Sequence, residues 1–191
     1  MHKHIWIIIL GLLIGFASCK KPVNYNDDNS LKLSFSTDTV TFDTVFTTIG
    51  SSTRQLMIYN DNDDNIKISS IRLEAGNQSQ FAINVDGESG YDFSDVEIFA
   101  KDSIFVFVRV TVNPDNQNTP FFIEDKLIFE TNNNTQYVSL TAYGQNANYI
   151  IADQHINGFP KFKIIADSLQ EVRWTSEKPY VIYGYALINS Y

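Results

Sequence analysis

Few side chains in this 191-residue chain could carry catalysis, because it has three histidines and one cysteine. Two of the histidines precede an apolar N-terminal run, which leaves His155 as the one histidine in the body of the chain. It stands in the polar stretch DQHING between two β-rich regions, where an exposed linker histidine is favoured over a general base. The sequence has no glycine-rich phosphate loop and no paired metal-ligand histidine motif. We therefore predict no catalytic residue, no metal, no cofactor and no enzymatic activity.

Two pairs of closely spaced acids could in principle assist glycoside hydrolysis, and they are Glu124 with Asp125 and Asp167 with Glu171. Such chemistry needs a defined separation between the two carboxyl groups, which the sequence does not give. Acidic side chains are abundant here, with 22 Asp and Glu against 14 Lys and Arg, for a net charge of -8. We expect these pairs to be solvated. The same balance disfavours a nucleic-acid partner, because such proteins neutralise phosphates with basic side chains.

An acidic stretch beginning with Asp61, Asp63 and Asn65 is similar to the first half of a calcium-binding loop. The pattern then fails, because Ile66 stands where that loop needs glycine and Arg72 where it needs a bidentate glutamate. We predict a hairpin turn here. Weak adventitious calcium binding is the minority alternative.

The lone cysteine follows an N-terminal export pattern. Lys3 gives a basic start, Ile5 to Phe16 are apolar, and Ala17 and Ser18 are small residues before Cys19. The apolar run is shorter than the about 20 residues that a spanning helix needs. We predict that residues 1–18 are a removed signal peptide, with an incidental cysteine near an ordinary secretory cleavage site as the alternative.

The sequence FASC at residues 16–19 resembles the lipobox of bacterial lipoproteins, with Phe16 where the family usually has leucine. The resemblance implies that the thiol of Cys19 carries diacylglycerol and that the protein is anchored to a membrane without spanning it. Lys20, rather than aspartate, follows the cysteine, which favours delivery to the outer membrane. Both its periplasmic face and the cell surface stay open. Residues 19–30 are polar and aperiodic, so we predict a flexible tether.

From Leu31 onward the pattern has a period of two, which indicates β-strands. The strand candidates are LKLSFS, TVTFDTVF, RQLMIYN, IKISSIRL, FAINV, VEIFA, SIFVFVRVTV, KLIFET and QYVSLTAY. Predicted turns lie at residues 60–65, 86–87, 113–115 and 132–134. Short strands at this spacing predict an all-β fold with an antiparallel immunoglobulin-like β-sandwich over residues 31–146.

Two family resemblances refine this prediction. The segments TFDTVFTTIG, LMIYN, IKI, LIFETN and VSLTAYG look like immunoglobulin-like domains of the ASH and DUF1573 groups. Asn60 and Asn132 end strands there and can satisfy turn backbone with their side chains. Residues 33–190 also resemble the N-terminal part of Bacteroidetes lipoproteins that continue into a right-handed parallel β-helix. That resemblance implies that residues 147–191 are a connector and the start of an incomplete, truncated β-helix-like region, packed less well than residues 31–144.

Two sets of residues are candidates for contact with, or attachment of, glycans. The candidate glycan-contact residues, whose alternative is simple packing, are Trp174, Tyr180, Tyr183 and Tyr185. A second set fits the Asp-Ser/Thr-apolar pattern that Bacteroidetes use for O-glycosylation, and its acceptors are Thr39, Thr44, Ser103 and Ser168. The alternative there is that the aspartate opens a strand as a turn residue.

Together these features predict a non-catalytic lipoprotein whose sandwich is a stalk or interaction module at the outer membrane. Its partners would be the membrane, through the lipid anchor, and glycans or another envelope protein. The alternative is a fragment of a polysaccharide-binding or polysaccharide-degrading β-helix protein whose catalytic part is missing.

Overall fold

The computed structural model describes residues 23–166 and 173–188, which form an all-β structure with one short 3-10 turn, η1 (Gly76–Gln78). The main strands of the first region are β1 (Ser34–Phe35), β2 (Thr39–Phe46), β3 (Arg54–Tyr59), β4 (Ile66–Leu73), β5 (Phe81–Val85), β9 (Ser103–Val110), β10 (Phe121–Thr131) and β11 (Asn134–Gln145). Shorter strands are β6 (Glu88–Gly90), β7 (Asp92–Phe93) and β8 (Val96–Ile98). No helix among these residues is long and apolar enough to cross a membrane.

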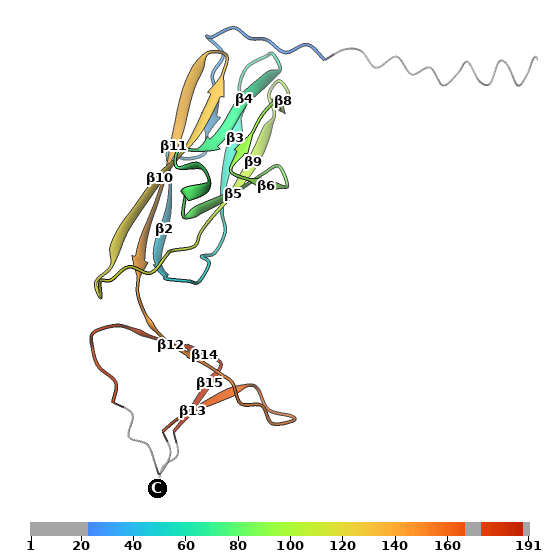
Figure 1. The fold of residues 1–191 in the computed structure, drawn as a ribbon. Coiled ribbons are helices and arrows are strands. Elements are labelled where there is room, and N and C mark those ends of the chain that lie inside the picture. Colours follow the sequence, from blue (N-terminus) through green and yellow to red (C-terminus); the bar gives the residue numbers. More distant parts are fainter. Residues whose placement is uncertain (1–22, 167–172, 189–191) are drawn as a thin grey trace, which may run out of the picture.

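The strands form two facing sheets, one with the order β1-β3-β9-β5-β6 and one with the order β2-β11-β10-β4-β7 (Figure 1). An immunoglobulin domain places its strands A, B, E and D in one sheet and C, F and G in the other. Naming β1, β3, β4, β5, β9, β10 and β11 as A to G reproduces this division. The predicted immunoglobulin-like sandwich is therefore confirmed. Its pairs are antiparallel except for β2, which runs parallel to β11.

Alternating side chains separate the core from the surface. In β9 every second residue is buried, and these are Ile104, Val106, Val108 and Val110. The two sheets meet through apolar contacts such as Phe42 of β2 against Phe81 of β5, with ring centroids 6.0 Å apart. Burying side chains of this size contributes about 1.5–3 kcal/mol each, so the core is the main source of stability.

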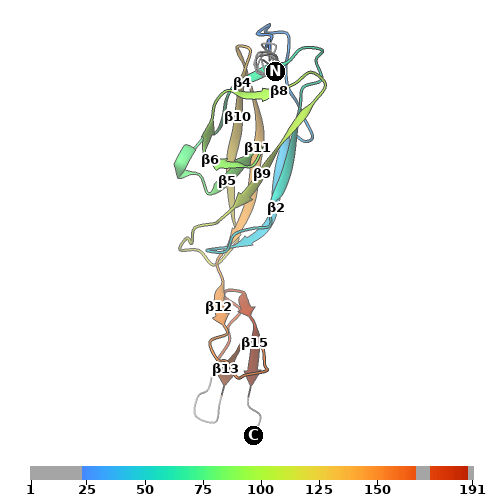
Figure 2. The ribbon, with the colours of Figure 1, turned by 90° about the vertical axis from the view of Figure 1, so that its right-hand side faces the viewer.

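A long hairpin of β10 and β11 runs the length of the sandwich (Figure 2). Its turn residues Asn132 and Asn133 have φ angles of 51° and 58°. Two successive positive φ angles define the type I′ turn, which asparagine tolerates and which matches the twist of paired strands. The side chain of Asn132 was expected to bond to the turn backbone. It instead donates to the Asp28 carbonyl at 3.1 Å. The predicted turn itself is confirmed.

The turn at residues 60–65 connects the two sheets, so the predicted hairpin is wrong: β3 belongs to one sheet and β4 to the other. Its residue types are typical of a hairpin turn, but the strands on its two sides pair with different neighbours. Asn60, which is 1% exposed, holds the arch together. Its amide nitrogen donates to the carbonyls of Asp64, Ile98 and Phe99 at 2.8, 3.1 and 3.0 Å. Its oxygen accepts from the backbone N–H of Asn62 at 3.1 Å.

The N-terminal segment lies against one end of the sandwich, which differs from the flexible tether expected over residues 19–30. The Asn26 N–H donates to the Asn65 carbonyl at 2.9 Å. The side-chain amide of Asn134 donates to the Asn29 carbonyl at 2.8 Å. These partners are remote in sequence, so composition alone could not reveal the contacts. Residues 1–22, which include the predicted signal peptide, lie outside the described residues.

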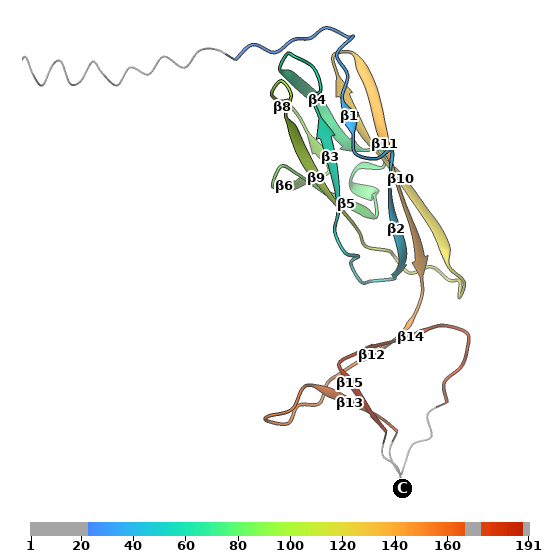
Figure 3. The same ribbon diagram turned by 180° about the vertical axis from the view of Figure 1, so that it is seen from behind.

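The C-terminal segment contains β12 (Asn148–Ile151), β13 (Phe162–Ala166), β14 (Tyr180–Tyr183) and β15 (Tyr185–Ile188). β12 pairs with β14 and β13 with β15, both in parallel. None of the side chains described in this segment is fully buried, whereas the sandwich has a continuous core. The expected difference in packing is confirmed. Figure 3 shows the segment at the end of the sandwich opposite the N-terminal chain.

We expect Asn60→Ala to lower the free energy of unfolding by about 2–4 kcal/mol, because one buried and two partly buried carbonyls lose their donor. Asn60→Asp should cost at least as much, because a carboxylate oxygen cannot donate to those carbonyls. Urea denaturation of the full chain measures both. Asn116→Ala, at an exposed position, is the matched control and should change stability by less than about 0.5 kcal/mol. Equal stability of all variants would contradict the role of Asn60.

Candidate functional site

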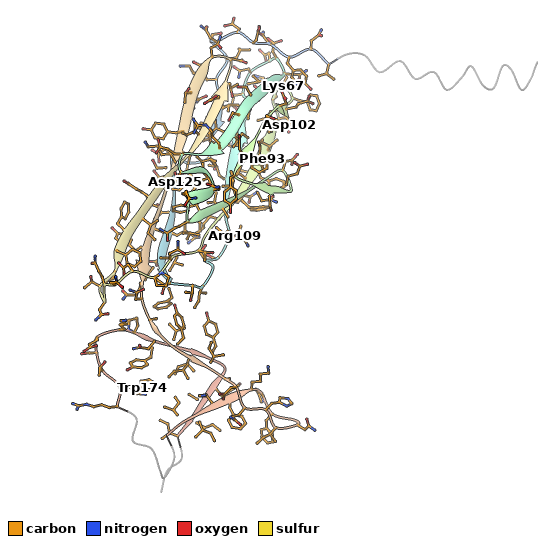
Figure 4. All side chains as sticks on the ribbon, in the orientation of Figure 1. Lys67, Phe93, Asp102, Arg109, Asp125 and Trp174 are labelled. Carbon is orange, nitrogen blue, oxygen red and sulfur yellow. The ribbon has the colours of Figure 1, made fainter. Side chains whose placement is uncertain are left out.

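The two acids at positions 124 and 125 do not form a catalytic pair. Neighbouring residues of a strand point to opposite faces, and in β10 Glu124 is exposed while Asp125 is buried. The expectation that Asp125 is solvated is therefore wrong. Its carboxylate accepts from the Ala75 N–H at 3.2 Å and from the Ser79 hydroxyl (Figure 4). Asp125 thus ties η1 to the sheet. The second pair, Asp167 and Glu171, lies outside the described residues.

Neither His155 nor the acidic turn forms a site. His155 is exposed in the connector between β12 and β13. In the turn, the Lys101 ammonium lies 3.0 Å from Asp63 Oδ1 and 2.7 Å from the Asp61 carbonyl oxygen. A protein cation thus lies against Asp63, one of the carboxylates that a calcium ion would use. Across residues 23–166 and 173–188, no three His, Cys, Asp or Glu side chains gather as a metal site would require.

The four candidate glycan-contact aromatics do not converge. Trp174, 43% exposed, stacks on Tyr180 with ring centroids 4.4 Å apart and an interplanar angle of 12°. Tyr183 lines a hollow beside Phe42 of the sandwich, and Tyr185 lines an apolar groove elsewhere in the segment. Simple packing, the alternative considered from sequence, does not describe three of them, because Trp174, Tyr183 and Tyr185 are exposed. Trp174 lies in the C-terminal segment, well apart from Arg109 in the sandwich (Figure 4).

The described O-glycosylation candidates occupy strands. Thr39 and Ser103 are the first residues of β2 and β9 and are half-buried, as expected if the preceding aspartates open those strands. Thr44 lies within β2 and is exposed, beside an irregularity in the pairing with β11. It is therefore the most accessible of these three acceptors. Ser168 and the lipidation candidate Cys19 lie outside the described residues.

A hollow on the outer face of the β1-β3-β9-β5-β6 sheet was not found from sequence. It has a volume of about 440 Å³ and opens beside Tyr91, Phe107 and Arg109. Its outward residues come from three strands and the loop before β3, so only the register between strands brings them together. The alternation in SIFVFVRV does predict that Phe107 and Arg109 share a face, which was the one available signal.

A polar cluster attaches the N-terminal segment to β4 and β8. The Lys67 ammonium lies 4.7 Å from the centre of the Tyr25 ring and 3.3 Å from Glu97 Oε1. The Tyr25 hydroxyl donates to the Glu97 carboxylate, which raises the pKa of Tyr25 from 10.0 to about 12. The same hydrogen bond, followed by the interaction with Lys67, lowers the pKa of Glu97. The cluster therefore stabilises the docked segment while Tyr25 is neutral and Glu97 is ionised.

The chain matches no family model, and no curated protein matches it. Solved structures give weak likenesses. The Vibrio cholerae VesB protease is 10% identical over 59% of this chain and 31% of its own, with a TM-score of 0.40. A Porphyromonas gingivalis protein of unknown function is 11% identical over 68% and 61% of the two chains, with a TM-score of 0.43. The ASH/PapD-like domain 7 of human CEP192 is 12% identical over 69% and 94%, with a TM-score of 0.37. Likenesses at these levels carry no functional argument, and the fold assignment rests on strand topology.

We expect calcium to leave the protein's melting temperature unchanged within about 1 °C. Lys101 already neutralises Asp63 and occupies the carbonyl of Asp61. Thermal unfolding of the full chain in excess calcium and in excess chelator tests this. A rise of several degrees with calcium would show that the turn binds the ion after all.

Docking of the N-terminal segment should depend on pH at both extremes. Because the pKa of Glu97 is lowered in the docked state, its contribution to docking is present above the ordinary glutamate pKa and is lost as the pH falls through the lowered value. Because the pKa of Tyr25 is raised, its contribution to docking is fully present below pH 10.0 and is lost as the pH rises through about 12. Nuclear magnetic resonance titration of the Tyr25 ring and the Glu97 carboxyl measures both limbs.

The matched variants for this titration are Tyr25→Phe and Lys67→Gln. Tyr25→Phe should bring the pKa of Glu97 back toward its ordinary value, because the hydrogen bond is the largest cause of the lowering. Lys67→Gln should also raise the pKa of Glu97, because both the hydrogen bond and the charge of Lys67 lower it. An unchanged pKa of Glu97 in Tyr25→Phe would refute the assigned cause.

Proposed function

We propose that the protein is an exported lipoprotein, anchored through Cys19 to the outer membrane, whose sandwich is a non-catalytic spacer and interaction module. The basic start, the apolar run and the two small residues before the cysteine support the anchor. At about 0.8 kcal/mol per buried CH₂, two or three acyl chains hold a protein on a membrane far more firmly than one.

The path of the chain through the sandwich carries the spacer proposal. The N-terminal segment contacts Asn65 and Asn134, at the end of the sandwich that contains the β10–β11 turn. β11 then leads away from that end to Gln145, where the chain leaves the sandwich (Figure 2). A strand of 12 residues spans about 40 Å. The sandwich would therefore separate the anchored end from β12–β15 by about the length of this hairpin.

The surface supports an interaction role better than catalysis. Asp125 is bound within the fold, and the neighbouring Glu124 faces the opposite way. The features proposed for contact with a partner are the hollow beside Arg109 and the exposed aromatics of the C-terminal segment. Glycans or another envelope protein are the partners proposed for these surfaces.

The parallel strand pairs favour a second candidate function. β14 lies beside β12 and β15 beside β13, so one passage of the chain stacks on the previous one. Successive coils of a parallel β-helix stack in this way. The chain would then be part of a polysaccharide-binding or polysaccharide-degrading protein, with catalytic residues in a part outside these 191 residues. The gene sequence downstream of the codon for Tyr191 would test this, because further coils with clustered Asp, Arg or His would support the enzyme.

We expect Cys19→Ser to abolish incorporation of labelled palmitate when the full chain is expressed in a bacterium with an outer membrane, because the modified thiol is removed. Ser18→Ala is the matched control, since it keeps a small residue before the cysteine and should preserve labelling. Membrane fractionation and intact mass of the mature protein complete the test. An unlabelled wild type, or equal labelling of Cys19→Ser, would overturn the anchor.

A further inference from the structure

We propose that the hollow beside Arg109 binds an acidic sugar unit of a polysaccharide, with the guanidinium on the sugar carboxylate and the rings of Tyr91 and Phe107 beside its apolar face. The site lies entirely on the sandwich. It therefore rests neither on the lipid anchor nor on any continuation of β12–β15.

Strand register builds the hollow. Phe107 and Arg109 point outward from β9, where they pair with Asn84 and Ala82 of β5. Because the side chain of Ala82 is only a methyl group, it leaves space beside Arg109 of β9. Tyr91 follows β6 at the edge of the sheet. The full lining is Thr53, Ala82, Ile83, Asn84, Ser89, Gly90, Tyr91, Phe107, Val108 and Arg109. At about 440 Å³, the hollow falls within the size range of small-ligand sites.

The charge of the lining differs from that of the rest of the protein. The chain carries 22 acidic side chains, yet the lining holds one cation, Arg109, and no acid. Within the described residues Arg109 forms neither an ion pair nor a side-chain hydrogen bond, whereas Arg72 is paired with Glu130. A guanidinium presents a planar set of donors that matches a carboxylate in a bidentate pair. The charge of the lining therefore favours binding of an anion.

The other lining groups favour a sugar over a simple anion. Tyr91 and Phe107 are 46% and 37% exposed, so their rings are available for contact. Phe107 is held against Phe105, with ring centroids 4.9 Å apart, which limits the ordering needed on binding. The amide of Asn84 is fixed by bonds to Ser89 Oγ and the Gly87 N–H, both 3.1 Å. Fixed amide and hydroxyl groups beside aromatic rings suit a ligand with hydroxyls on one side and an apolar face on the other.

An acidic peptide fits the hollow less well. An extended peptide binds a sheet through backbone groups along a free edge. The aromatic ring of Phe107 and the guanidinium of Arg109 instead stand on β9, which is paired on both sides by β3 and β5. The ligand must therefore meet side chains on a sheet face, which a sugar ring can do.

The test is isothermal titration of the full chain, in detergent micelles, with tetragalacturonate. We expect saturable binding that Arg109→Gln weakens at least 10-fold, as expected for loss of a charge-assisted bond. Arg54→Gln is the matched control, because Arg54 is an exposed arginine of the same sheet outside the lining, and it should bind as the wild type does. Ala82→Leu keeps the charge but fills the hollow and should also weaken binding at least 10-fold.

Three further ligands separate the possible sources of affinity. Neutral galactose oligosaccharides should bind at least 10-fold more weakly than tetragalacturonate, and so should an acidic peptide of equal charge. Inorganic phosphate should not compete at the concentration of the sugar. No binding of tetragalacturonate, equal loss in Arg109→Gln and Arg54→Gln, or a preference for the peptide or for phosphate would each overturn the proposal.

Discussion

The long antiparallel pairing of β10 with β11 is the constraint on which the rest of the structure depends. It aligns eleven residue pairs, from Phe121 with Gly144 to Thr131 with Asn134. β10 also pairs with β4, and β11 with β2, so the hairpin forms the centre of its sheet. Its turn end receives the N-terminal segment, and its open end releases the chain toward β12. The N-terminal segment and the exit toward β12 therefore lie at opposite ends of one hairpin. The turn of that hairpin requires two positive φ angles.

The two faces of β9 separate the core from the proposed sugar site. Val106 and Val108 are fully buried and belong to the core, while Phe107 and Arg109 lie between and beyond them on the outer face. Because a strand alternates its side chains, outward residues can change with little cost to the core. An exposed aromatic residue, and an arginine that has no ion pair among the described residues, contribute little to folding on such a face. They are the residues on which the proposed sugar site depends.

Local patterns predicted the elements of the fold, and long-range pairing decided what the sequence left open. Alternating residues gave the strands, and the asparagine-rich stretch at residues 132–134 gave the hairpin turn. The stretch at residues 60–65 has similar turn-forming residue types but joins two sheets, because β3 pairs with β9 while β4 pairs with β10. The hollow at Arg109 depends on the register of β9 against β5, which no local pattern specifies.

The proposed anchor and the proposed sugar site would use different surfaces of the sandwich. The N-terminal segment is attached through Tyr25 to Lys67 of β4 and Glu97 of β8, in the sheet that contains the hairpin. Arg109 stands on the outer face of the opposite sheet. A chain held at the turn end of the hairpin therefore leaves the hollow open along the side of the sandwich.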